Sequence, residues 1–222
     1  MDDSWFWPVL KNYRDEAGRT LKECEEEWIS RDLEAENAQN YISKELWRYS
    51  PKPSSAVVKL TQLLEAFFGK HDQFTYVEFG VCFGTTLAQV GLTFPNVHLI
   101  GFEQLEARYK VASWLVNRVA QTFPFPKSEL YCCPVLNHGF SPGSVDVVYM
   151  DTNHEYPNDY EYILHFLSSG YLKKDFVFIG DDPTHTGTKT SRERFISEYS
   201  HQYKIITRED WNLWWFYPKQ PG

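Results

Sequence analysis

The segment from Thr75 to Leu87, TYVEFGVCFGTTL, constrains the possible fold of this chain more than any other. It opens as a short apolar run interrupted by Glu78, passes through Gly80 and Gly84, and continues into residues that favour a helix. The segment therefore predicts a strand, a glycine turn and a helix. Glycines in such a turn let a ligand or a crossing backbone approach more closely than a Cβ would allow. The free N–H groups of the first helical turn face the same place.

The acid and the glycines are spaced as E-x-G-x-x-x-G, so the G-x-G-x-x-G fingerprint of NAD-binding proteins is not met. An acid two residues before the first glycine suits a cationic ligand better than a pyrophosphate. The pattern resembles the first motif of the class I S-adenosylmethionine-dependent methyltransferases. That resemblance implies that S-adenosylmethionine is bound by Glu78, Gly80, Gly84 and Thr85. A strand-to-helix turn with a purely structural role is the alternative.

From Thr75 onward, predicted strands and helices alternate, which is typical of a parallel sheet covered on both faces. The apolar runs predict strands at 75–79, 97–102, 129–133, 145–150 and 175–180, with helices at 85–92, 106–122 and 157–169. Two further runs, 203–207 and 213–217, predict an antiparallel hairpin. We therefore expect an α/β fold, a Rossmann-like doubly wound sheet of five parallel strands closed by a C-terminal antiparallel hairpin. The class I methyltransferase fold has the same pattern.

The first 50 residues differ in composition from the rest of the chain. They begin with three aromatic residues, Trp5, Phe6 and Trp7, and continue as a charged, helix-prone segment. The proline-containing stretch 50–54 marks a boundary. We expect a helical arm or lid over residues 1–50 and a methyltransferase domain over residues 51–222. The arm could supply apolar walls for an acceptor pocket, pack on the core, or join copies of the chain in a homo-oligomer.

Composition excludes some classes of partner. The net charge of −8 argues against a nucleic-acid partner and favours small or neutral substrates. The chain has no run of 18 apolar residues and no basic start typical of a signal peptide, so we expect no membrane segment and a cytoplasmic location. The four cysteines lack zinc-site spacing. Cys132 and Cys133 are interpreted as alternating positions of a buried strand, not as a disulfide, which indicates a reducing compartment.

In an open α/β sheet, ligands bind beyond the carboxyl ends of the strands, where the strand order reverses. Glu103 directly follows the second predicted strand. An acid at this place can accept hydrogen bonds from ribose hydroxyls, which is also its role in the methyltransferases that the chain resembles. An ordinary solvated loop acid is the alternative. After the third strand, Cys132 and Cys133 stand where that family often has an acid or polar residue near the adenine, so the adenine contacts stay unassigned.

Three further acids follow the next two strands: Asp151 ends VDVVYMD, and Asp181 and Asp182 end FVFIGDD. Carboxylates gathered at one edge repel one another unless a cation lies between them, and all-oxygen ligands select a hard ion such as Mg²⁺. A helix cap or turn is the alternative role for Asp181 and Asp182. The two segments resemble the D-x-x-H and D-D motifs of the macrocin-type, metal-dependent sugar O-methyltransferases. That resemblance implies that Asp151, Asp181 and Asp182 bind the metal, although Pro183 replaces an aromatic residue common in that family.

His154 and His185 each lie three residues beyond a carboxylate, and either could act as a general base. His154, with Asp151, is the preferred catalytic pair because it matches the D-x-x-H motif. We therefore predict Mg²⁺-dependent O-methylation of a hydroxyl on a small-molecule acceptor, such as a sugar, a natural product or a catechol-like compound. The alternatives are a metal-independent N-methyltransferase, an iron- and dioxygen-dependent hydroxylase of related sequence, and a non-catalytic binding protein with the same fold.

Overall fold

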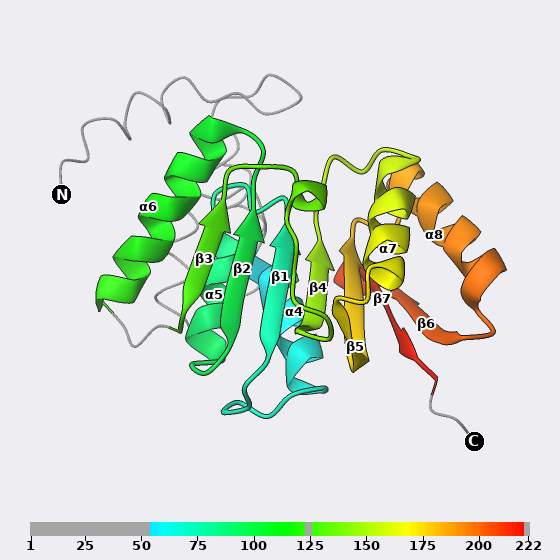
Figure 1. The fold of residues 1–222 in the computed structure, drawn as a ribbon, viewed down its shortest axis with the longest axis horizontal. Helices are drawn as coiled ribbons and strands as arrows, with labels where there is room; N and C mark the ends of the chain where they lie inside the picture. The colour runs from blue at the N-terminus through cyan, green and yellow to red at the C-terminus, as the bar shows by residue number, and fades with distance from the viewer. Residues whose placement is uncertain (1–53, 123–125, 220–222) are drawn as a thin grey trace.

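The computed structural model describes residues 54–122 and 126–219, and these residues form one seven-stranded sheet with helices on both faces (Figure 1). The arm expected over residues 1–50 lies outside the described residues. The strand order is β3-β2-β1-β4-β5-β7-β6. This order reverses between β1 and β4, since the chain first builds outward from β1 to β3 and then continues on the other side of β1.

The strands are β1 (Thr75–Phe79), β2 (His98–Phe102), β3 (Ser128–Tyr131), β4 (Val145–Met150), β5 (Leu172–Asp181), β6 (Tyr203–Arg208) and β7 (Leu213–Pro218). The helices are α4 (Ser54–Glu65), α5 (Thr85–Thr93), α6 (Glu106–Thr122), α7 (Asn158–Ser168) and α8 (Thr186–Tyr199), with short 3₁₀ turns η1 (Val135–Asn137) and η2 (Glu209–Trp211). The first five strands pair in parallel. β7 runs antiparallel to both β5 and β6, so the expected C-terminal hairpin forms with its second strand inside the sheet.

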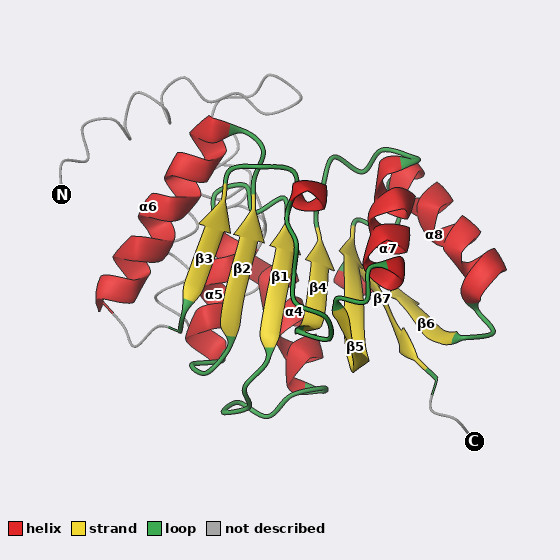
Figure 2. Ribbon diagram, viewed as in Figure 1, coloured by secondary structure: helices red, strands yellow, loops and turns green. Residues whose placement is uncertain are grey.

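Each face of the sheet has its own hydrophobic core because successive side chains of a strand point to opposite faces. Tyr76 and Val77 are neighbours on β1 and belong to different clusters. The first cluster joins the sheet to α4, α5 and α6, and the second joins it to α7 and α8. In Figure 2, α4 and α5 lie behind the sheet and α7 lies in front of it. The sheet is therefore doubly wound, as the alternating pattern predicted.

The expectation that Cys132 and Cys133 alternate in a buried strand was wrong. β3 ends at Tyr131, Cys132 is exposed, and Cys133 is only partly buried. The chain leaves the sheet at Pro134, which has no N–H to donate to a neighbouring strand, and enters η1. Both thiols are free. The fifth strand, in contrast, begins at Leu172, earlier than its apolar run suggests, because its exposed first residues continue the pairing with β4 across a register shift.

Candidate active site

The glycine turn after β1 adopts left-handed backbone conformations at three residues: Gly80 (φ 76°), Cys82 (φ 53°) and Gly84 (φ 82°). A Cβ on Gly80 would lie 1.8 Å from the carbonyl oxygen of Asp151. A Cβ on Gly84 would lie 3.1 Å from the Cα of Ala112 on α6. Gly80 is therefore required by the crossing backbone after β4, and Gly84 by the close approach of a helix.

The turn leads directly into α5, whose first residues are buried at the carboxyl edge of the sheet. Thr85 and Thr86 are 5% and 4% exposed. Within the part of the chain that the structure describes, the buried Oγ1 of Thr85 has no hydrogen-bond partner. An orphaned hydroxyl beside the free N–H groups of a helix start is a place where a ligand can complete the hydrogen bonding.

The structure brings Glu103 to the glycine turn. Glu103 is 6% exposed, and its two carboxylate oxygens accept hydrogen bonds from the backbone N–H groups of Cys82 and Leu105, both at 2.9 Å. It thereby joins the loop after β1 to the loop after β2. Each carboxylate oxygen can accept a second hydrogen bond, so Glu103 keeps acceptor capacity for hydroxyl groups of a ligand.

Glu78 lies on β1, two residues before Gly80, and is 1% exposed. The hydroxyl of Tyr76 donates to its Oε2 at 3.0 Å. Tyr149 lies directly opposite Glu78 in the pairing of β1 with β4. The pKa of Tyr149 is held well above its usual value, first by burial and then by the charges of Asp181, Asp151, Glu78 and Asp182. The charges of these four acids therefore all act on one buried tyrosine.

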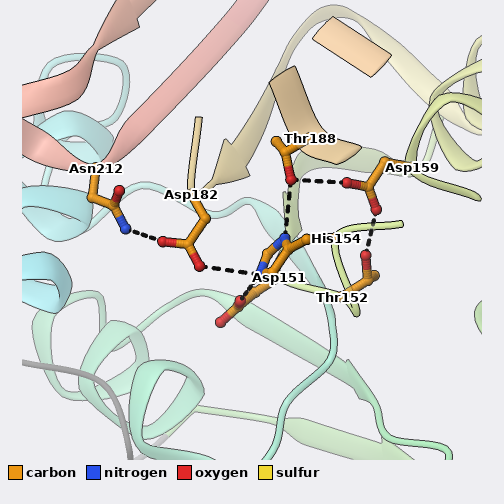
Figure 3. A network of polar contacts seen from close by, with 7 residues as sticks. All are labelled: Asp151, Thr152, His154, Asp159, Asp182, Thr188 and Asn212. Atoms are coloured by element: carbon orange, nitrogen blue, oxygen red, sulfur yellow. Dashed lines mark hydrogen bonds and ion pairs between the residues drawn. The ribbon is translucent and has the colours of Figure 1, made fainter. Parts of the chain in front are cut away.

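The ends of β4 and β5 bring three of the predicted residues into one network (Figure 3). His154 Nε2 lies 3.2 Å from Asp182 Oδ2 and 3.5 Å from Asp151 Oδ1. The side-chain amide of Asn212 donates to the other oxygen of Asp182. His154 (φ 56°) and Asp182 (φ 47°) both have positive φ, which is uncommon for residues other than glycine, although His and Asp are among the types that adopt it most often. Residues in sparsely populated backbone regions cluster at functional sites.

Charge dominates the behaviour of His154 in this network. Burial alone would lower its pKa, but the hydrogen bonds and charges of Asp151 and Asp182 outweigh burial and raise the pKa to about 10. His154 is therefore an imidazolium at neutral pH in this arrangement. It acts here as the cation that separates two carboxylates, and it cannot accept a proton while both contacts persist.

On its other side, His154 is held by residues that sequence reasoning missed. Thr188 Oγ1 lies 3.2 Å from His154 Nδ1 and donates to Asp159 Oδ2 at 3.1 Å, while Thr152 donates to Asp159 Oδ1 at 2.5 Å. Because the single hydroxyl proton of Thr188 goes to Asp159, its oxygen accepts from the Nδ1–H of His154. The proton on Nδ1 is thereby fixed, and Nε2 is the atom that exchanges protons.

Asp159 is fully buried in the first turn of α7, and its pKa is raised because burial disfavours the charged form. In the sequence it resembled an ordinary acid at a helix start, and nothing in the spacing connects it to His154. His185, the second candidate base, lies with its ring centroid 5.4 Å from that of His154. It immediately precedes α8, and its backbone N–H donates to the carbonyl oxygen of Asp182 at 3.0 Å.

Comparisons with solved structures locate this architecture among known folds. The O-methyltransferase from Bacillus cereus, solved with SAH, aligns with a TM-score of 0.56 and 16% identity over 98% of this chain and 96% of that chain. The SAH-bound methyltransferase PaMTH1 from Podospora anserina aligns with a TM-score of 0.58 and 12% identity over 98% of this chain and 95% of that chain. The O-methyltransferase TomG from Streptomyces achromogenes, solved with SAM, aligns with a TM-score of 0.54 and 15% identity over 97% of this chain and 94% of that chain.

The chain has the class I methyltransferase fold. No protein-family model matches it, and no curated protein sequence does. At 12–16% identity these similarities concern the fold, so the chemistry has to be argued from the residues of this chain.

The residues around the glycine turn fit the cofactor that the methyltransferase fold implies. Thr85 supplies an orphaned buried hydroxyl, and Glu103 supplies a carboxylate with acceptor capacity left. Glu78 adds a buried negative charge that suits a cationic ligand. Gly80 and Gly84 shape the turn, although the atoms that need their lack of a side chain belong to the protein itself.

The predicted metal ligands fit Mg²⁺ in kind, since all are carboxylates at two adjacent strand ends. Met150 pairs with Gly180, so Asp151 and Asp181 follow at the same level, and Asp181 is 2% exposed. In this structure, however, Asp151 and Asp182 are engaged with His154. Across residues 54–122 and 126–219, no three His, Cys, Asp or Glu side chains are grouped to hold a metal ion.

The network around His154 predicts a specific dependence of stability on pH. The pKa of His154 is about 10 in the folded chain, against an ordinary value of 6.5. Its contribution to stability is therefore complete below about pH 6.5 and is lost as the pH rises through about 10. We expect the parent chain to lose roughly 3–5 kcal/mol more stability over this range than His154→Asn.

The measurement is urea unfolding from pH 6 to pH 10 in buffers with EDTA. Asparagine is chosen because it tolerates positive φ, and His185→Asn is the control that should keep the pH dependence of the parent. Identical pH dependence in the parent and His154→Asn would contradict the assignment of charge to His154.

Proposed function

We propose that the chain is an S-adenosylmethionine-dependent methyltransferase that methylates a hydroxyl group of a small-molecule acceptor with the help of Mg²⁺. The observation that carries the proposal is the junction of Glu103 with the glycine turn, at the reversal of strand order and beside the orphaned Thr85 hydroxyl. This is the position at which open α/β sheets bind nucleotide-like ligands. Solved structures of the same fold that contain SAH or SAM support the choice of cofactor.

The cofactor supplies a methyl group activated by a sulfonium, so the protein has to align donor and acceptor and to manage the acceptor proton. Glu103 accepts hydrogen bonds from the two ribose hydroxyls, and the start of α5 with Thr85 binds polar atoms of the same ligand. The buried Glu78 favours its positive charge. The net charge of the chain, −8, is consistent with a cationic donor and a small acceptor.

The acceptor hydroxyl is proposed to bind beside His154, Asp151 and Asp182. Nε2 is the atom through which His154 would exchange a proton, because Thr188 and Asp159 hold the proton on Nδ1. It can accept a proton only when its contacts with Asp151 and Asp182 are broken. Mg²⁺ would be held by Asp151, Asp181 and Asp182, and it would lower the pKa of a bound hydroxyl. It would also compete with His154 for the same carboxylates.

A metal-independent methyltransferase is the second candidate, and one observation favours it. His154 already provides a positive charge between Asp151 and Asp182, as a metal ion otherwise would. With this internal cation the carboxylates are balanced, and an amine acceptor would need no metal. The two candidates share the donor site and differ in their response to EDTA.

Removal of the Glu103 carboxylate should weaken cofactor binding. Two charge-assisted hydrogen bonds to ribose are each worth about 1.5–3 kcal/mol, so we expect Glu103→Ala to bind S-adenosylhomocysteine at least roughly tenfold more weakly by titration calorimetry. Glu106→Ala is the matched control, because Glu106 is an exposed acid at the start of α6 that pairs with Lys110. Equal affinity of Glu103→Ala and the parent would place the donor site elsewhere, provided that both proteins melt at similar temperatures.

The metal proposal predicts that Asp181→Asn retains donor binding and loses turnover. Methyl transfer to a panel of catechols, sugars and glycosides should fall roughly 100-fold or more in this variant and in EDTA, with recovery on addition of Mg²⁺. Asp175→Asn, which changes an exposed acid of the same strand, should behave like the parent. Full activity in excess EDTA would contradict the metal proposal and favour the second candidate.

Residues 1–50 are proposed to contribute to the acceptor pocket, because they begin with three aromatic residues, Trp5, Phe6 and Trp7, which can line a pocket for a ring-shaped acceptor. With an acceptor from the panel, Trp5→Ala combined with Trp7→Ala should raise the acceptor KM roughly tenfold and leave the affinity for S-adenosylhomocysteine unchanged. An unchanged acceptor KM would limit this segment to packing or to contacts between copies of the chain.

A further inference from the structure

The layer between α8 and the sheet contains buried polar atoms that have no hydrogen-bond partner. α8 buries one stripe of residues: Thr188, Ser191, Arg192 and Phe195. Thr188 bonds to Asp159, as described above. Within the described residues, however, Ser191 Oγ and the Nε and Nη1 atoms of Arg192 have no partner, and neither does Nε1 of Trp214 on β7. Ser191 and Trp214 are fully buried, and Arg192 is 8% exposed.

Ser191, Arg192 and Trp214 occupy similar positions along the common direction of α8 and β7. The rings of Phe195 and Phe216 are in contact, with centroids 4.3 Å apart, and thus align α8 with β7. Both elements run in the same direction, because β7 is antiparallel to β5 and α8 starts beyond the carboxyl end of β5 and runs back (Figure 1). From this contact, Arg192 and Ser191 lie about 4.5 and 6 Å toward the start of α8, and Trp214 lies about 6.6 Å toward the start of β7.

Trp214 is held rigidly at this position. A Cβ on Gly180 would lie 2.1 Å from Trp214 Nε1, so the indole covers the backbone of β5 at a position that only glycine allows. Trp214 also stacks with Phe216, with centroids 6.0 Å apart. The indole N–H is therefore presented at a fixed position within the layer, where it can neither reach solvent nor find a partner in the described residues.

A buried guanidinium without an anionic partner is unfavourable by several kcal/mol. Asp159, a buried acid in the first turn of α7, is already bonded by Thr152 and Thr188. Glu198, further along α8, pairs with Arg194 at the surface. The charge of Arg192 and the unused donors beside it match the requirements of an anion, since such groups in a folded protein call for an ion or water as partner.

We propose that Arg192, Ser191 and Trp214 form a buried site for a small monovalent anion, either chloride or a carboxylate. Arg192 supplies the positive charge, and the hydroxyl and indole groups donate hydrogen bonds. The site lies about one helical turn beyond Thr188, on the same buried stripe of α8. It does not depend on the proposed methyltransferase activity.

The test is thermal unfolding in sodium formate and, separately, in sodium chloride, from an anion-poor buffer to saturation. Because an anion that binds only the folded chain stabilises it, the Tm of the parent should rise saturably by roughly 3–8 °C. Arg192→Met should show no saturable rise, and without added anion it should melt at or above the temperature of the parent, because an uncompensated buried charge has been removed.

Arg194→Met is the matched control. It changes the net charge equally and lies on the same helix, but Arg194 is exposed and paired with Glu198, so the rise should persist. Ser191→Ala, a small change that preserves packing, should shift the midpoint of the response roughly threefold to tenfold to higher concentration. A response to formate alone assigns the site to carboxylates, and a response to both salts assigns it to monovalent anions in general. Equal salt responses in the parent, Arg192→Met and Arg194→Met would overturn the proposal.

Discussion

The close passage of two backbones at Gly80 is the constraint on which the rest of the site depends. The carbonyl oxygen of Asp151 occupies the space that a Cβ on Gly80 would fill. The loop after β4 is thereby fixed against the glycine turn after β1. As a consequence, the acids at the ends of β4 and β5 and the glycine turn with Glu103 share one edge of the sheet. A donor molecule and an acceptor bound at these two places would be neighbours.

The repulsion between the carboxylates at this edge of the sheet can be relieved by the protein's own imidazolium or by a bound cation. The charges of four carboxylates act on the buried Tyr149, and like charges near one another are stabilised by a cation between them. In the structure, the imidazolium of His154 provides part of that charge between Asp151 and Asp182. A divalent ion and a sulfonium are other cations that could share the task. The protonation of His154 is therefore tied to whatever else occupies the edge, because every added cation reduces the stabilisation that the carboxylates give to the imidazolium.

Much of the fold could be predicted because it follows from local patterns. The apolar runs of β1, β2 and β4 and the glycine turn were located within a residue or two, and the C-terminal hairpin was predicted from its two apolar runs. β3 ends at Tyr131, two residues earlier than expected, because the apolar character of Cys132 and Cys133 does not show where the pairing with β2 stops. The pairing of Asp159, Thr188 and His154 could not be predicted, since it depends on how α7 and α8 dock.

The position of β7 inside the sheet determines when the sheet can be completed during translation. Asn212, which holds Asp182, follows it by 30 residues, and the strand that covers β5 is the last one in the chain. While the ribosome is still producing β6, the outer side of β5 has no neighbour and its carboxyl end lacks this amide. The edge of the sheet that carries Asp182 can therefore be completed only when translation of the described domain is nearly finished.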